Sequence, residues 1–254
     1  MTTDSLGDRM KRYEATTRAV LPPRTYTILR VDGRAFHTFL RHAERPFDDR
    51  VMDCMDEVGK ALCAEISGSV LAYTQSDECS VLITDFTSHG TQPWFGGVVQ
   101  KMTSIAASLA TVAFNEAYAT PYGGRRALFD ARVFTLSSPV EVANYFLWRQ
   151  RDCVRNSITM AAQAVFSHRD LHRKSTDDMQ NMLWAEGINW NNYPDGAKRG
   201  RVCTRRAAEQ ATISSIRSWW ETQAAPHFTA EPDSWLASTI PTLPTLTPGD
   251  HPQK

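Results

Sequence analysis

Residues 71–83 read Leu-Ala-Tyr-Thr-Gln-Ser-Asp-Glu-Cys-Ser-Val-Leu-Ile, and this stretch decides the fold. Two apolar, β-prone arms flank a polar centre, Gln75–Glu78, which is the pattern of a tight β-hairpin. Ser and Asp both favour turns, so Ser76 and Asp77 suit the tip. Turn chemistry alone does not explain why two acids, Asp77 and Glu78, stand side by side there.

A further acid follows another apolar run, Tyr-Thr-Ile-Leu-Arg-Val-Asp-Gly at residues 26–33. If this strand and the hairpin are neighbours in one sheet, Asp32 and Asp77 meet at its edge. Two carboxylates at close range repel each other unless a cation neutralises them, and carboxylate oxygens suit hard divalent cations. The pair therefore predicts a Mg²⁺ site. The alternative is that each acid only caps a turn.

The order of the elements supports this meeting. Apolar periodicity predicts, in chain order, elements at residues 8–20 (helix), 24–31 (strand), about 49–66 (helix), 71–83 (hairpin), 94–118 (helix) and 129–134 (strand). This β-α-β-β-α-β order is that of the ferredoxin-like split unit, an α+β fold. Its central strands are the first and the third, so Asp32 lies close to the hairpin that carries Asp77.

The remaining chain predicts additional C-terminal helices. Pro139 begins a helix that runs to about Val165, shorter helices follow over residues 168–187, and residues 202–206 form a strand. Pro and Thr dominate from residue 226 onward. We therefore divide the chain into a catalytic core with an N-terminal helix, a helical extension and basic strand that complete the same domain, and a tail expected to be disordered: residues 1–136, 137–222 and 223–254.

Composition excludes several classes of protein. The chain has 254 residues with 28 basic and 28 acidic side chains, so a nucleic-acid partner needs local basic clusters. Its five cysteines form no C-x-x-C pair, which disfavours a zinc site or a disulfide framework. No run reaches the roughly 18 apolar residues of a membrane span, and no signal peptide is evident. We expect a soluble, cytoplasmic protein.

Several residues suit phosphate chemistry. Residues 33–37, Gly-Arg-Ala-Phe-His, offer backbone N–H groups at a helix start, which is a natural phosphate seat. Arg30, Arg45 and Lys101 are candidate clamps for a triphosphate, although each considered alone also suits an ordinary surface charge. Two Mg²⁺ ions that bridge a triphosphate and an attacking hydroxyl would carry out nucleotidyl transfer. We expect Glu78 to point to the other face of its strand, in a supporting role.

A basic run follows the helical extension. Between Gly196 and Arg206 there are five basic residues and no acid: Lys198, Arg199, Arg201, Arg205 and Arg206. Such a run is often only a solvated face, but it is also the best candidate in this chain for contact with an RNA backbone.

Five motifs together resemble the tRNA-His guanylyltransferase family: residues 30–37 (Arg-Val-Asp-Gly-Arg-Ala-Phe-His), 73–80 (Tyr-Thr-Gln-Ser-Asp-Glu-Cys-Ser), Trp94-Phe95 with Lys101, 129–133 (Phe-Asp-Ala-Arg-Val) and 145–150 (Tyr-Phe-Leu-Trp-Arg-Gln). The resemblance covers about residues 8–206. It implies a palm-like domain, related to polymerases and nucleotidyl cyclases, that extends the 5′ end of tRNA in the 3′–5′ direction. The reaction would be guanylylation of tRNA-His or repair of tRNA 5′ ends.

The resemblance also implies roles for particular residues. Metal positions map to Asp32, the Gly33 carbonyl and Asp77, with two Mg²⁺ ions. Nucleotide contacts map to Asp32, Gly33, Arg34, Ala35, Phe36, His37, Ser76 and Asp77, and triphosphate contacts to Arg30, Arg45 and Lys101. In the implied mechanism ATP activates a 5′-monophosphate, and the 3′-hydroxyl of GTP then attacks it and releases AMP. Family members are typically homotetramers.

Two departures from the family pattern bear on the substrate. Family members usually carry a basic residue where this chain has Val98, which would otherwise stand one helical turn from Lys101; the alternative is that Val98 packs in the core with Met102 and Ile105. Residues 153–158, Cys-Val-Arg-Asn-Ser-Ile, resemble the bacterial and archaeal branch, which favours template-dependent repair of truncated tRNAs.

Two rival functions stay open. A nucleotidyl cyclase pairs a strand-end acid with a hairpin acid in the same way, but it would need no tRNA. A non-catalytic RNA-binding protein would use the same fold without chemistry.

Overall fold

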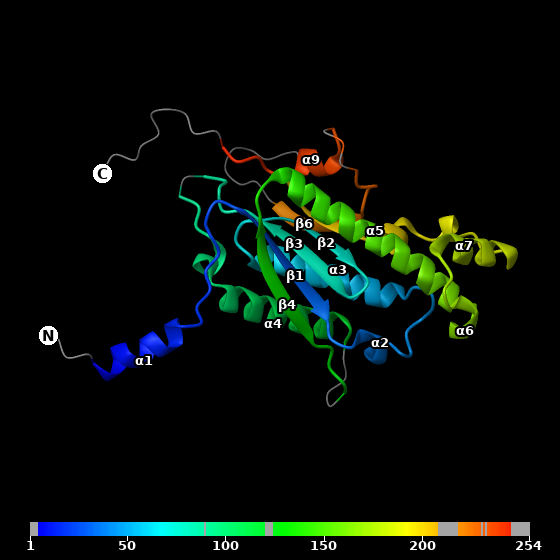
Figure 1. Ribbon diagram of the computed structural model, residues 1–254, viewed down its shortest axis with the longest axis horizontal. Helices are drawn as coiled ribbons and strands as arrows, with labels where there is room; N and C mark the ends of the chain where they lie inside the picture. The colour runs from blue at the N-terminus through cyan, green and yellow to red at the C-terminus, as the bar shows by residue number, and fades with distance from the viewer. Residues whose placement is uncertain are drawn as a thin grey trace.

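The computed structural model describes residues 5–88, 90–119, 124–207, 218–229, 231 and 233–244. Over these residues the strands form one antiparallel sheet in the order β4-β1-β3-β2-β5-β6 (Figure 1). The strand bounds are Tyr26–Gly33 (β1), Ser69–Gln75 (β2), Glu78–Ile83 (β3), Phe129–Leu136 (β4), Arg201–Ala207 (β5) and Ser218–Ala224 (β6). The predicted β-α-β-β-α-β order is confirmed, and β1 and β3 are neighbours as expected.

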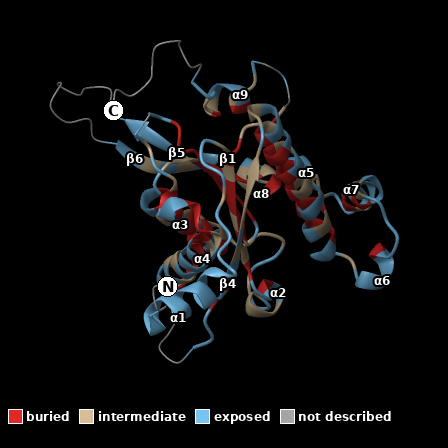
Figure 2. Ribbon diagram, turned by 60° about the vertical axis from the view of Figure 1, so that its left-hand side comes forward, coloured by how far each residue is buried: buried red, intermediate tan, exposed pale blue. Residues whose placement is uncertain are grey.

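Different helices cover the two faces of the sheet, because alternate residues of a strand point to opposite sides. The helices α3 (Asp49–Glu65) and α4 (Val99–Ala117) pack on one face, against Leu29 and Val31 of β1. The long helix α5 (Pro139–Gln163) crosses the other face, over Ile28 (Figure 1). The burial colours of Figure 2 follow this arrangement, with the inner sides of α3, α4 and α5 buried.

The helix α5 is the longest helix over the described residues, and its sequence defines its start. The Ser138 hydroxyl accepts a hydrogen bond from the Glu141 amide (3.2 Å), and Pro139 takes the first helical position, where a missing N–H costs nothing. One face of the helix, which carries Val142, Phe146, Arg149 and Cys153, is buried. Beyond it, α5 packs on α6 (His168–Leu171) and α7 (Thr176–Ala185).

The remaining helices are short or peripheral. They are α1 (Leu6–Ala15), α2 (Phe36–Phe39), α8 (Asp195–Arg199), α9 (Trp235–Thr239) and the 3₁₀ helices η1 (Trp94–Gly97) and η2 (Trp190–Asn192). The helix α1 ends earlier than predicted and buries none of its residues. After α1 the chain packs against the rest of the protein, where Val20 forms a β-bridge with Val98. Within the described ranges, no helix is both long and apolar enough to cross a membrane.

The prediction of a disordered tail from residue 223 is wrong for the residues that the structure describes. The strand β6 continues to Ala224, and the Phe228 ring is buried and stacks on Trp235 with ring centres 5.7 Å apart. The side chain of Gln150 on α5 binds both the Pro226 carbonyl (2.8 Å) and the Phe228 amide (2.7 Å). The prediction relied on the abundance of Pro and Thr and overlooked a few large apolar residues. These residues cover the α5 side of the sheet. Residues 245–254 lie outside the described ranges.

Candidate active site

The predicted meeting of β1 with the hairpin is confirmed. Asp32 and Glu78 are cross-strand partners, and the Gly33 amide donates a hydrogen bond to the Asp77 carbonyl (3.0 Å). The hairpin turn consists of Ser76 and Asp77, and Ser76 adopts a positive φ of 46°. The strand pairing therefore holds the backbone of the two predicted metal positions, Asp32 and Asp77, together at one edge of the sheet.

The electrostatics of the two acids differ from those of ordinary surface carboxylates. The pKa of Asp77 is raised to about 6, chiefly by burial and also by the nearby charge of Asp32, although hydrogen bonds to its own backbone and to Ser76 oppose the rise. Burial also raises the pKa of Asp32, as does Asp130 on the neighbouring strand β4. Both shifts mean that the free protein disfavours the two negative charges, and a bound cation would remove that cost.

Asp32, Asp77 and the Gly33 carbonyl fit a hard divalent cation. Among the described residues, no cluster of three or more His, Cys, Asp or Glu side chains has the geometry of a metal site. The described residues therefore do not form the complete set of protein ligands that a structural zinc ion needs. Mg²⁺ typically uses one or two carboxylates and completes its shell with water and substrate phosphates. Asp32, Asp77 and the Gly33 carbonyl are such a partial set.

Glu78 has a role that the sequence analysis understated. It lies opposite Asp32 on the α5 side of the sheet, where Arg149 of α5 binds both of its carboxylate oxygens, at 2.8 and 2.9 Å. The same guanidinium also binds Asp152 (2.7 Å). This bidentate, buried contact neutralises the third acid of the edge. Because Glu78 is already paired, Asp32 and Asp77 remain the predicted metal ligands of this edge, and Asp130 of β4, directly opposite Asp32, is a further exposed acid there.

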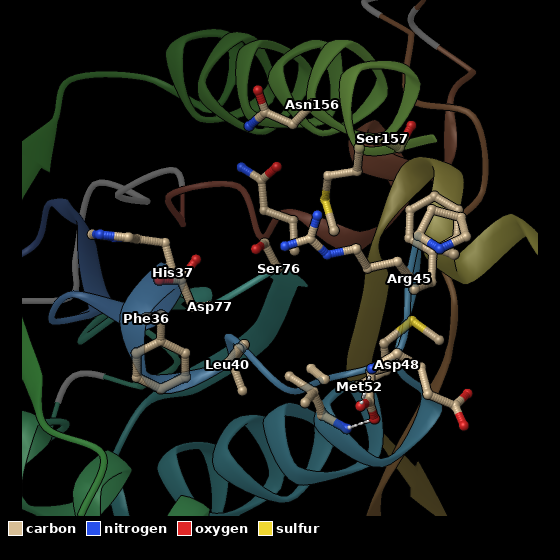
Figure 3. Close-up of a pocket in the computed structure, with 18 of the residues that line it drawn as sticks. Phe36, His37, Leu40, Arg45, Asp48, Met52, Ser76, Asp77, Asn156 and Ser157 are labelled. Atoms are coloured by element: carbon tan, nitrogen blue, oxygen red, sulfur yellow. Dashed lines mark hydrogen bonds between the residues drawn. The ribbon is translucent and has the colours of Figure 1, made fainter. Parts of the chain in front are cut away.

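An open pocket of about 510 Å³ lies beside Asp77, between the segment after β1, the hairpin tip and α5 (Figure 3). Five of the predicted nucleotide contacts line it together with Asp77: Gly33, Ala35, Phe36, His37 and Ser76. Arg45, one of the predicted clamps, also faces this space. Asp32 and Arg34 do not line it. The Arg34 amide instead binds the Leu128 carbonyl (2.8 Å), and the Arg34 side chain is exposed.

The backbone after β1 forms a short helix at the predicted phosphate seat. The helix α2 is a single turn, and Ala35, which precedes it at the bend, adopts a positive φ of 54°. Phe36 anchors this bend, since its ring packs on Phe114 and Phe129 at 5.1 Å in each case. The pocket wall is therefore attached rigidly to α4 and β4.

Sequence reasoning missed the part of the pocket that α5 and the segment before β5 supply. Asn156 and Ser157 of α5 line the space, as does Met52 of α3 (Figure 3). Arg201 of β5 lines it too. Asn156 and Ser157 belong to the segment 153–158, which the sequence analysis used only to distinguish branches of a family. A side-chain amide and a hydroxyl at adjacent positions were the signal that could have marked it as a lining segment.

The predicted clamps do not all reach the site. Arg30 does, because its guanidinium lies 3.7 Å from Glu78 and its charge lowers the pKa of Asp32. Lys101 does not. It lies in the first turn of α4 beside Met102, which adjoins Thr27 at the opposite end of β1. Asp32 is five residues further along β1 than Thr27, a distance of about 16 Å, so Lys101 lies too far from the acids of its own chain to serve them as predicted.

Val98 is a core residue. Its side chain is 8% exposed, it precedes α4, and it pairs with Val20 at the same far end of the sheet. The burial of Val98 favours the alternative that it is a packed residue, although Ile105, one of its two expected partners, is 39% exposed.

The predicted RNA-contacting run at residues 198–206 is largely committed to contacts within the chain. Lys198 is buried and binds the Asn191 carbonyl (2.6 Å) and Asp195 (3.1 Å). Arg201 is buried and pairs with Asp56 of α3 (2.5 Å). Two further ion pairs engage the run, from Arg199 to Asp195 (2.6 Å) and from Arg206 to Glu221 (3.0 Å). The acids come from outside the run, which is why the run alone suggested a free basic surface. Arg205 is exposed and binds the Ser218 hydroxyl.

The fold and the site together define a class of protein. A β-α-β-β-α-β sheet that presents adjoining carboxylates from its first strand and its hairpin, beside an open pocket, is the arrangement of palm-type enzymes that act on nucleotides.

Comparison with known proteins agrees with this class. A family model described as "Thg1: tRNAHis guanylyltransferase" matches residues 7–137. The tRNA(His) guanylyltransferase of Debaryomyces hansenii is 30% identical over 204 residues, which cover 73% of this chain and 75% of that protein. The chain belongs to the tRNAHis guanylyltransferase family, a family of enzymes.

Two solved structures of bacterial relatives are also similar. A bacterial tRNA(His) guanylyltransferase (Thg1)-like protein in complex with ATP superposes with a TM-score of 0.84 at 39% identity, over 93% of this chain and 99% of that chain. A bacterial Thg1-like protein in complex with GTP gives 0.76 at 41% identity, over 88% and 94%.

The raised pKa of Asp77 predicts a pH-dependent stability. Its folded value of about 6 lies above the roughly 3.9 of an unfolded Asp, so this group destabilises the metal-free protein progressively as pH rises from about 4 to 6. Asp77→Asn should therefore stabilise the protein in EDTA at pH 7.5 by about 1–2 kcal/mol, and the gain should nearly vanish at about pH 3.5, below the unfolded pKa. Urea unfolding at both pH values measures this.

The matched control is Asp53→Asn on α3, where the carboxylate is exposed, and its effect should stay within about 0.5 kcal/mol at either pH. A loss of stability in Asp77→Asn at both pH values would show that hydrogen bonding, rather than charge repulsion, dominates at this position.

The buried pairing of Arg201 yields a second prediction. Arg201→Ala would leave the Asp56 carboxylate buried without its partner, which should cost about 3–5 kcal/mol of unfolding free energy. Arg205→Ala, on the same strand but exposed, should cost less than about 0.5 kcal/mol. Urea unfolding compares the two variants. Wild-type stability of Arg201→Ala, combined with weaker tRNA binding, would return this residue to an RNA-contacting role.

Proposed function

We propose that this chain is a Mg²⁺-dependent nucleotidyltransferase that adds G, or nucleotides copied from a template strand, to the 5′ end of tRNA in the 3′–5′ direction. The observation that carries the proposal is the placement of two half-buried carboxylates, Asp32 and Asp77, next to a pocket of nucleotide size. Membership of the family supplies tRNA as the class of acceptor.

Each residue of the site has a part in this proposal. Asp32, Asp77 and the Gly33 carbonyl would hold Mg²⁺, which neutralises phosphate oxygens and favours ionisation of an attacking hydroxyl. The backbone bend after β1 and Ser76 would orient a nucleotide in the pocket, with Arg45 as a cation for its phosphates. Both ATP and GTP are candidate occupants, since bacterial relatives have been solved with each.

The proposed reaction has two balanced steps. A 5′-monophosphate oxygen of the tRNA first attacks the α-phosphate of ATP, which forms an activated 5′ end and releases pyrophosphate. The 3′-hydroxyl of GTP then attacks the activated 5′-phosphate, so that a new P–O bond forms and AMP leaves. The pocket and the acids hold the reacting groups in line, and such positioning is a large part of catalysis of phosphoryl transfer.

A homotetramer in the cytoplasm is part of the same proposal. The outer side of α4 carries Lys101, Ile105 and Val112, all of them exposed and spaced so as to share one helix face. An apolar stripe of this kind suits contact with a second copy of the chain. Lys101, which lies far from the acids of its own chain, would then be available only to the site of a neighbouring subunit.

Purified protein incubated with Mg²⁺, ATP, labelled GTP and tRNA tests the proposal, with full-length and 5′-truncated tRNA in parallel. We expect label at the tRNA 5′ end, together with AMP and pyrophosphate, only when tRNA is present. Release of pyrophosphate from nucleotide alone would indicate a cyclase-like enzyme, and tRNA binding without any product would indicate a non-catalytic binder. Preference for the truncated tRNA would identify repair as the reaction.

The metal ligands carry a quantitative prediction. Asp32→Ala and Asp77→Ala should each reduce nucleotide addition about a thousandfold or more, since metal stabilisation is worth several kcal/mol of the barrier. Single-turnover assays of both variants, beside the surface control Asp53→Asn, measure the loss. Near-normal activity in either alanine variant would contradict the assignment of that acid.

A further inference from the structure

One motif stays without a role in the reaction described above. Residues 145–150, Tyr-Phe-Leu-Trp-Arg-Gln, lie on α5, where Tyr145, Phe146, Arg149 and Gln150 are buried while Trp148 is 54% exposed. Other exposed tryptophans among the described residues, Trp184 on α7 and Trp219 on β6, belong to elements away from the acid pair. Trp148 is separated from that pair by only a few side chains.

The Trp148 ring is held in place from two sides. The Arg149 guanidinium lies over it, 4.4 Å from the ring centre, and Tyr145 contacts it edge to face at 5.9 Å. Both neighbours are themselves fixed, because Arg149 is bound by Glu78 and the Tyr145 hydroxyl is 2.8 Å from that of Ser80. An aromatic ring positioned in this way loses little conformational freedom when a ligand binds its exposed surface.

The sheet next to Trp148 carries an arrangement of charges that suits phosphate. The register of β1 and β4 sets Arg30 directly opposite Arg132, on the side of the sheet that α5 crosses. Like charges in such a pair are unfavourable unless anions lie close, and each arginine has a carboxylate near it, Glu78 at 3.7 Å from Arg30 and Asp130 at 3.5 Å from Arg132. The Arg132 side chain is nevertheless about half exposed, and Nε of Arg30 is buried without a hydrogen-bond partner among the described residues. A nucleotide unit offers a base for the exposed ring and phosphate oxygens for these donors.

This surface is separate from the pocket. Neither Trp148 nor the two arginines line the pocket, and Asp32 faces this surface whereas Asp77 lines the pocket. The acid pair thus stands between the pocket, which fits a mononucleotide, and the exposed surface beside Trp148. An open surface suits a polynucleotide, because the chain has to continue away from the site.

We propose that Trp148 is the stacking platform for the base of the 5′-terminal nucleotide of the acceptor RNA, with the phosphate of that nucleotide toward Arg30 and Arg132. This inference rests on the proposed function, since it assigns the second substrate of that reaction to the open side of Asp32. Stacking between a base and an aromatic ring tolerates any base, which suits an enzyme that accepts different 5′ ends.

Binding of 5′-phosphorylated tRNA tests the platform, measured with Mg²⁺ and without nucleoside triphosphate. Trp148→Ala should weaken binding about tenfold, whereas Trp148→Phe should recover most of the affinity because a ring remains. Trp184→Ala, which removes an even more exposed indole from α7, is the matched control and should bind as the wild type does. KM for GTP should stay the same in all three variants.

A tRNA with an abasic 5′-terminal residue identifies the partner of the ring. It should bind the wild type about tenfold more weakly than intact tRNA, and Trp148→Ala should not weaken it further. If Trp148→Ala lowers the affinity for intact and for abasic tRNA equally, the stacking role is overturned. If this variant impairs only the binding of GTP, the choice of RNA as the ligand is overturned. Unchanged tRNA affinity in Trp148→Ala, with normal extension by the wild type, would refute the platform alone. A wild type that neither binds nor extends tRNA would refute the proposed function as well.

Discussion

The repulsion between two carboxylates that the fold holds together is the constraint on which the rest of this structure depends. The β1–β3 pairing and the hydrogen bond from the Gly33 amide to the Asp77 carbonyl keep Asp32 and Asp77 at one edge of the sheet. Partial burial raises the pKa of both acids, so the free protein carries an electrostatic cost there. A protein retains such a cost where a ligand removes it, and a cation with its phosphates is the ligand that the chemistry of these groups selects.

The helix α5 turns this edge into a site with two sides. Through Arg149 it pairs with Glu78, which lies directly opposite Asp32, and so compensates a third negative charge beside the acid pair. About two turns further on, Asn156 and Ser157 line the pocket. Gln150 of the same helix binds the backbone at Pro226 and Phe228, so the C-terminal segment holds α5 in position. One helix therefore couples the packing of the chain's end to the geometry of the acids.

The sequence could predict those features that depend on local pattern and on strand order. The alternation of apolar residues around Ser76 and Asp77 indicated the hairpin, and the β-α-β-β-α-β order placed it beside Asp32. Features that depend on contacts between distant segments were not predictable in this way. Arg201 seemed free because its partner, Asp56, is 145 residues earlier in the chain. Lys101 appeared near the acids only because direction along α4 cannot be read from a motif, and the packed tail was hidden by its Pro and Thr content.

The central claim is that Asp32 and Asp77 jointly hold a divalent cation that meets nucleotide phosphate. The most direct measurement is diffraction from crystals grown with Mn²⁺ and a non-hydrolysable GTP analogue, in which anomalous scattering locates the metal. The account predicts Mn²⁺ bonded to both carboxylates and to the Gly33 carbonyl, with triphosphate oxygens completing its shell. A nucleotide bound in the pocket with its metal held by other residues, or with the two carboxylates left unbound, would contradict it.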